Sequence, residues 1–238
     1  MRIAYVLFEV RRVVRDSRFL AFAVALPVGL FLLQAGMFGG ANGAASIMGG
    51  LAAFGAFRAA LDTGARAAVE RGAGWQRQLR LTPLTGAGYL AAKATVAMLV
   101  AVLPIAGVTL AAALLSGVHL SAGGWAGAVL GVWAGTVPFA LLGLLVGQVA
   151  TPQNVQTYQG ALLLLLGFAG GLLIPVSVFP RALASVAQAL PTYWLADIAH
   201  AAAAGGGRVG QAALVLGLYT LALGAAVIIR YRHDGART

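Results

Sequence analysis

Long apolar stretches separated by short polar segments run along almost the whole chain. The first, FLAFAVALPVGLFLLQAGMF at 19–38, has the roughly 20 residues that a helix needs to cross a bilayer. The pattern recurs, and the six candidate spans are 19–38, 43–61, 89–115, 125–149, 158–174 and 211–229. It predicts an all-α integral membrane protein with six transmembrane helices.

The composition supports this class. The 238 residues are 61% hydrophobic and 9% charged, whereas a soluble domain carries about 25% charged residues. A secretory signal peptide is the competing interpretation of the N-terminus. The first apolar stretch is longer than the apolar region of a signal peptide, so we expect it to be retained as a span. The sequence has no cysteine, which excludes disulfides and thiolate metal sites.

Basic residues are distributed unevenly between the two sides of the predicted membrane. Three clusters on one side hold twelve of the 16: Arg2, Arg11, Arg12, Arg15 and Arg18; Arg66, Arg71, Arg77 and Arg80; Arg230, Arg232 and Arg237. The opposite connections carry Arg181 and Arg208. Both termini are therefore expected in the cytoplasm, and this topology explains the net charge of +10 better than nucleic-acid binding does. Fifteen arginines against one lysine suggest a GC-rich bacterial genome, hence a bacterial cytoplasmic membrane.

Residues 1–18 are predicted to form an amphipathic helix ahead of the first span. At about 100° per residue, one face collects the apolar side chains of Ile3, Val6, Leu7, Val10, Val13 and Val14. Much of the opposite face carries Arg11, Arg12, Arg15 and Arg18. The pattern favours an interfacial helix that directs its arginines to headgroups or to a partner. A simple topology anchor is the alternative.

The polar segment between the second and third spans contains its own break signals. Arg66 and Glu70 are four residues apart, which favours a helix that continues below the membrane. Gly72 is expected to break that helix, and Pro83 to end a second short helix at 75–81. The resulting projection carries Trp75, Arg77, Leu79 and Arg80. We interpret it as a docking surface for another protein, with a solvated basic loop as the alternative.

The apolar segment 175–192 cannot be a continuous span, because Pro175, Pro180 and Pro191 interrupt it. A short helix is expected directly after Pro180. Irregular backbone at membrane depth requires protein or a cavity around it, so we predict a re-entrant helical hairpin at the extracytoplasmic mouth. An ordinary outer loop is the alternative.

Isolated polar residues give weaker signals. Lys93 lies near a predicted cytoplasmic span end and is expected to snorkel to the interface. No acidic residue lies in the middle of a predicted span, which argues against a proton-driven carrier. Asp197 and His200 are spaced as a metal or proton pair, but interfacial anchoring by Tyr193 and Trp194 explains this stretch better.

Two motifs give the chain a resemblance to the permeases of ABC-2 type transporters. ERGAGWQRQLRLTPLTGAGYLAAK resembles the family's first cytoplasmic loop, through Glu70, Arg71, Gly72, Leu79, Leu81 and Pro83. GLLIPVSVFPRALASVAQALPTYWLADIAHAA resembles the family's segment before the last span, through Gly170, Gly171, Pro175, Phe179, Pro180 and Pro191. With the N-terminal helix and six spans, the resemblance covers essentially the whole chain.

The resemblance implies a transport subunit that couples to a separate ATPase. Its coupling residues would be Glu70, Arg71, Gly72, Trp75, Arg77, Leu79, Arg80 and Pro83, beside the interfacial arginines Arg11, Arg12, Arg15 and Arg18. Its extracytoplasmic gate would contain Pro175, Phe179, Pro180 and Pro191. The sequence has no Gly-Lys-Ser/Thr phosphate loop, so ATP and Mg would bind to the partner and this chain would not be an enzyme.

The resulting prediction is one transmembrane domain over 1–238, with an interfacial helix at 1–18, a bundle at 19–229 and a cytoplasmic tail at 230–238. The expected function is ATP-driven export of an apolar or amphipathic molecule, as a homodimer or with a paralogous permease. Glycines such as Gly50 and Gly55 suit close helix packing, either within the chain or across a dimer, and the sequence does not decide between these two alternatives. The alternative function is a self-sufficient secondary carrier or a membrane scaffold.

Overall fold

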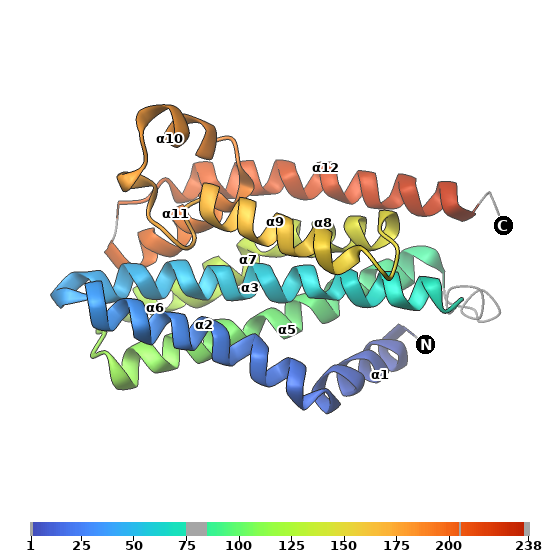
Figure 1. Cartoon of the computed structure of the whole chain (residues 1–238), viewed down its shortest axis with the longest axis horizontal. Coiled ribbons are helices and arrows are strands. Elements are labelled where there is room, and N and C mark those ends of the chain that lie inside the picture. The colour runs from blue at the N-terminus through green and yellow to red at the C-terminus, as the bar shows by residue number, and fades with distance from the viewer. Residues whose placement is uncertain (1, 75–84, 205, 236–238) are drawn as a thin grey trace.

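A computed structural model describes residues 2–74, 85–204 and 206–235, and within these ranges the chain forms helices and no strand (Figure 1). The helices are α1 (Arg2–Arg15), α2 (Ser17–Phe38), α3 (Gly40–Gly72), α5 (Gly86–Leu115), α6 (Ala122–Ala126), the π-helical turn η1 (Gly127–Gly131), α7 (Val132–Gly135), α8 (Val137–Val149), α9 (Val155–Ala169), the 3-10 turn η2 (Val176–Val178), α10 (Arg181–Ala187), α11 (Pro191–Ala204) and α12 (Val209–Gly235). The predicted all-α class is confirmed.

Five stretches of helix are long and apolar enough to cross a membrane within the described ranges. They are Ser17–Phe38, Gly43–Gly72, Gly86–Leu115, Ala122–Val149 and Val209–His233. The fourth is not one regular helix, because it contains the π-helical turn and restarts as α8 with Pro138 in its first turn. The chain is thus a multi-pass membrane protein with five candidate spans of full length.

The fifth predicted span differs from the prediction. It corresponds to α9, which has 15 residues and ends at Ala169 rather than continuing to 174. Gly170 and Gly171 follow, and Gly171 has a φ of +82°, which a glycine adopts without strain. At about 1.5 Å per residue α9 is roughly 22 Å long, shorter than the roughly 30 Å hydrocarbon core. A sixth crossing therefore stays a prediction.

The central helix of the bundle is α3, which packs against α2, α5, α8, α9 and α11. Its contact with α8 brings backbone against backbone, since a Cβ added to Gly64 would overlap the carbonyl group of Gly143. Gly147 on α8 fits against the main chain of Gly64 in the same way. Small residues permit this approach and the dispersion contacts that come with it.

The two glycines that the sequence left open also pack within the chain. A Cβ on Gly50 would lie 2.7 Å from the carbonyl oxygen of Leu172, and one on Gly55 would lie 2.6 Å from Cβ of Pro104. These two positions therefore serve packing inside the bundle.

The two ends of the bundle contain different parts of the chain (Figure 1). The start of α1, the C-terminal ends of α3 and α12 and the start of α5 lie together at one end. The α2–α3 junction, α10 and the start of α12 lie at the opposite end. The described residues of the three basic clusters thus belong to elements that meet at one end.

α12 extends beyond the predicted span end at 229 and continues into the expected tail as far as Gly235. Its Tyr231 ring packs against Gly86 and stacks with Tyr89, with the ring centroids 6.2 Å apart. This aromatic contact joins the C-terminal part of α12 to the start of α5.

Candidate functional site

The N-terminal helix docks on the bundle through a mixed face. α1 ends at Arg15, and Asp16 begins α2 by accepting a hydrogen bond from the backbone N–H of Phe19 at 3.1 Å. A helix is present at the predicted place, but it ends at Arg15, three residues before the predicted end at residue 18, and Arg18 lies on α2. Arg11 and Arg15 are exposed.

The apolar face of α1 is divided between two environments. Val13 is buried with Ala59, Val96 and Val100, and Val6 and Val10 pack at the margin of the same cluster. Leu7 and Val14, which the sequence placed on the same face, are exposed. One strip of α1 thus contacts α3 and α5, and the second strip is available to lipid. An interfacial position of this helix stays a prediction.

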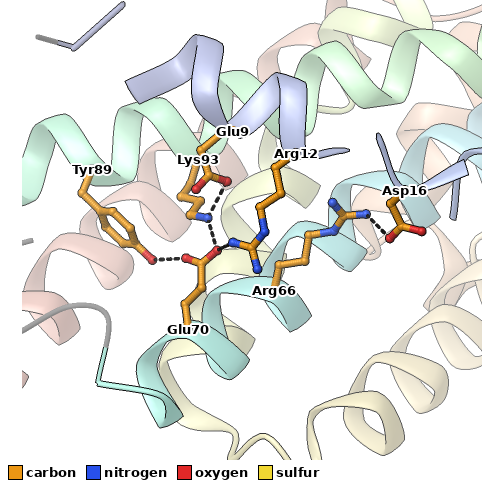
Figure 2. Close-up of polar contacts among 7 residues, drawn as sticks. All are labelled: Glu9, Arg12, Asp16, Arg66, Glu70, Tyr89 and Lys93. Atoms are coloured by element: carbon orange, nitrogen blue, oxygen red, sulfur yellow. Dashed lines mark hydrogen bonds and ion pairs between the residues drawn. The ribbon is translucent and has the colours of Figure 1, made fainter. Parts of the chain in front are cut away.

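A buried charge cluster lies between α1, α3 and α5 (Figure 2). We define it by Glu9, Arg12, Glu70, Tyr89 and Lys93. The Lys93 ammonium donates to Oε2 of Glu9 at 2.7 Å and to Oε1 of Glu70 at 2.8 Å. The exposed fraction of the Lys93 side chain is 1%, so the prediction that it snorkels to the interface is wrong. Two carboxylates draw it inward.

The cluster extends from its buried lysine toward the surface. Arg12, whose side chain is 51% exposed, donates to Oε1 of Glu70 at 2.7 Å. The Tyr89 hydroxyl donates to Oε2 of Glu70 at 3.4 Å. Beyond it, Arg66 lies 3.9 Å from Asp16 (Figure 2), at the junction of α1 and α2.

The charges of the cluster balance. The carboxylates of Glu9 and Glu70 face the cations of Arg12 and Lys93, so the formal sum is zero. A buried ion pair adds little net stability against an apolar substitute, but removing one partner leaves a buried charge unpaired and costs about 3–5 kcal/mol. Burial, and then Glu9 and Glu70, raise the pKa of the neighbouring Tyr5 hydroxyl, which therefore stays neutral. The cluster thus holds α1 in one position on α3 and α5.

The last turn of α3 is also fixed to α8. The Arg71 guanidinium donates to the main-chain carbonyl oxygens of Gln148 and Ala150, where α8 ends and its carbonyls lack helical partners. Gly72 lies against the Pro152 ring, since an added Cβ would meet it. The predicted break of the helix after Gly72 is confirmed, because α3 ends there and Gly74 has a φ of +74°.

The predicted coupling residues divide into two groups. Glu70, Arg71 and Gly72 lie in the last turn of α3, and Glu70, with 4% of its side chain exposed, has its partners inside the chain. The others, Trp75, Arg77, Leu79, Arg80 and Pro83, lie outside the described residues. Contact of this segment with an ATPase stays a prediction.

The predicted gate residues lie at the ends of the short helices between α9 and α11. Pro175 precedes η2, Pro180 precedes α10, and Pro191 begins α11. Phe179 lies between η2 and α10. The expected short helix after Pro180 is confirmed as Arg181–Ala187, and the entry of this segment into the bilayer stays a prediction. Among the described residues, no group of three or more His, Asp or Glu side chains could hold a metal ion.

Sequence reasoning missed the charge cluster, although a signal was present. The chain has one lysine and six acidic residues, and both Glu9 and Lys93 stand beside apolar runs. A charge in such a setting is costly unless it is paired. The sequence does not show that the partners lie 84 residues apart.

Comparisons with known proteins match most of the chain. Residues 3–203 match the sequence model of a family described as ABC-2 type transporter. The chain is similar to a curated protein named as a transport permease, YvfS of Bacillus subtilis (strain 168), with 26% identity over 219 residues that cover 90% of this chain and 89% of the relative. No solved structure matches the chain significantly. The matched region contains the charge cluster and the segment between α9 and α11.

Proposed function

The chain belongs to the ABC-2 type transporter family, and we propose that it is the membrane subunit of an ATP-driven exporter whose ATPase is a separate polypeptide. Membership makes it a membrane transport protein. We assign ATP hydrolysis to a separate polypeptide from the sequence, because Lys93 is the only lysine of this chain and Ala92 and Ala94 flank it. A phosphate-binding loop needs Gly-Lys-Ser/Thr, so ATP and Mg would bind to the partner.

The observation that carries the coupling proposal is the charge cluster. It joins α1, the end of α3 and the start of α5 at the end of the bundle where the basic clusters meet. We propose that the partner contacts α1 and residues 70–84 there. Arg11 and Arg15 offer exposed positive charge for an acidic partner or for lipid headgroups. A movement of the partner against α1 or against residues 70–84 would move α1, α3 and α5 together, since ion pairs connect these three helices.

The remaining parts of the proposal follow the family and the topology. Both termini lie in the cytoplasm of a bacterium, and the chain works in the cytoplasmic membrane as a homodimer or with a paralogous permease. The cargo is an apolar or amphipathic molecule, which suits a bundle that exposes many large apolar side chains along its spans. The segment 175–191 forms the outer gate.

The test uses a variant that keeps the charge balance. In Glu9→Gln with Lys93→Met, Glu70 keeps Arg12 as its cation, so the fold retains no unpaired buried charge. The ion pair between α1 and α5 is lost, while their apolar contacts remain. In proteoliposomes with the ATPase that co-purifies with the chain, we expect ATP hydrolysis to continue and ATP-dependent export to fall by about tenfold or more.

Val14→Ala is the matched control, because it shortens an exposed side chain of the same helix, leaves the cluster and the exposed arginines intact, and should change export less than the double variant. Export at the normal rate by the double variant would show that the cluster plays no part in coupling.

A proton-driven carrier is the second candidate, because the cluster contains two buried carboxylates, the groups on which such carriers rely. Each carboxylate faces a cation in the structure, which favours a structural role. Export from the same proteoliposomes driven by a proton gradient without ATP would establish the carrier and overturn the exporter.

A further inference from the structure

A polar pocket lies at the opposite end of the bundle from the charge cluster. Its volume is about 270 Å³, and its polar lining comes from Ser46, Ser177, Tyr193, Asp197 and His200. Ser46 stands near the start of α3 and Glu70 near its end, so the pocket and the cluster are about 36 Å apart along that helix. We call it the Asp197 pocket.

Three elements build the pocket. Asp197 and His200 lie one turn apart on α11, and Ser177 belongs to η2. α11 approaches α3 closely, because a Cβ on Gly49 would lie 2.8 Å from the carbonyl oxygen of Ala199. A Cβ on Gly50 would lie 3.8 Å from Nε2 of His200, so the imidazole is held beside α3.

The Asp197 carboxylate has unused hydrogen-bonding capacity. Its Oδ2 accepts from the backbone N–H of Arg208 at 3.0 Å. The Arg208 guanidinium turns elsewhere: it donates to the Tyr193 hydroxyl at 2.8 Å and lies over the Trp194 ring at 5.1 Å from the centroid. Within the described ranges, no cation lies at ion-pair distance from Asp197. A carboxylate accepts several hydrogen bonds, so acceptor positions remain.

His200 adds a second acceptor. In the described part of the chain its imidazole makes no hydrogen bond, although it lines the pocket. α11 lies outside the five candidate spans, and burial lowers the pKa of His200 while Asp197 opposes that shift. A neutral imidazole offers one unprotonated ring nitrogen. The pocket therefore presents one negative charge, one neutral nitrogen acceptor and two serine hydroxyls.

We propose that the Asp197 pocket binds a primary ammonium group. An ammonium carries three N–H donors and one positive charge. The carboxylate, the imidazole and a serine hydroxyl provide three acceptors and the opposite charge, and hydrogen bonds between charged partners are the stronger class. The volume corresponds to about nine water molecules at roughly 30 Å³ each, so it holds a small amine or the amine end of a longer molecule. This proposal does not rest on the coupling proposal, because binding requires no ATPase.

The test measures binding by the full-length protein in nanodiscs. The three histidines are labelled with 15N, and the His200 signals are identified through His200→Gln. Titration with hexylammonium chloride should shift the His200 ring nitrogens in a saturable way and leave His119 and His233 unchanged. Hexanol and hexanoate have the same chain without the cation, and neither should produce this shift.

Asp197→Asn is the matched variant. Its amide oxygen still accepts from the Arg208 N–H, so the local structure is kept while the charge is removed. The affinity for hexylammonium should fall on the order of tenfold or more. An unchanged affinity in this variant would overturn the proposal. So would an equal response of the wild-type protein to hexanol or hexanoate, a comparison that holds even if the variant does not fold.

Discussion

Lys93 shows how a single charge can be held in an apolar chain. Its ammonium lies 2.7 Å from one carboxylate and 2.8 Å from another, and these come from two different helices. The ion pairs add little to the free energy of unfolding compared with apolar side chains of the same size. Removing one partner is costly, however, because it leaves the other charge buried and unpaired. Lys93 therefore contributes less to overall stability than to fixing the position of α1 on α3 and α5.

Lys93→Met leaves both Glu9 and the inner side of Glu70 without their cation. We expect the free energy of unfolding to fall by about 3–5 kcal/mol, the usual cost of an unpaired buried charge. Arg12→Gln should cost much less, because Arg12 is half exposed and Lys93 still faces Glu70. Denaturant titration of the purified protein in detergent compares the two. Equal losses would show that burial of the cluster does not set its energetics.

At the scale of the element, the contact of α3 with α8 depends on residues that have no side chain. Gly64 and Gly143 touch through their backbones, whereas Gly29 on α2 has nothing within 4 Å of an added Cβ. Gly64 and Gly29 both lie within helices, but an added Cβ would overlap a neighbouring backbone only at Gly64.

Gly64→Ala should therefore separate α3 from α8 and lower stability by about 1–3 kcal/mol or more, since overpacking forces the backbone to move. Gly29→Ala should be neutral or slightly stabilising, because alanine favours the helix. Thermal unfolding in the same detergent measures both. A loss at Gly29 as large as that at Gly64 would contradict this view of the α3–α8 contact.

The elements also show where sequence reasoning works and where it ends. The apolar runs of α2, α5 and α12 gave nearly correct boundaries at their membrane portions, because burial in lipid is a property of the run itself. The end of α9 was missed by five residues, since Gly170 reads equally well as part of a span. The pairing of Glu9 with Lys93 could not be predicted from the sequence, because contacts between residues 84 positions apart depend on tertiary packing.

At the scale of the whole molecule, the two ends of the bundle carry different chemistry. One end holds the charge cluster and the described arginines of the basic clusters, and the other holds the Asp197 pocket and α10. This polarity gives the topology proposal a direct test.

A reporter enzyme that is active only outside the cytoplasm should be inactive when fused after Thr238 and active when inserted at Gly206. The reason is the excess of arginine at the end where α1, α3 and α12 meet. Colony activity normalised to the amount of fusion protein measures the result. The reverse pattern would place both termini outside and overturn the proposed orientation.

The sequence separation inside the charge cluster has a consequence for biosynthesis. Glu9 leaves the ribosome 84 residues before Lys93, and at about 5–20 residues per second the interval is roughly 4–17 s. During that time α1 has neither Lys93 nor the finished α5 to bind, and its carboxylate must stay hydrated or near headgroups. α1 is thus made before α5 and reaches its place only afterwards, so a chain that stalls before α5 keeps α1 undocked.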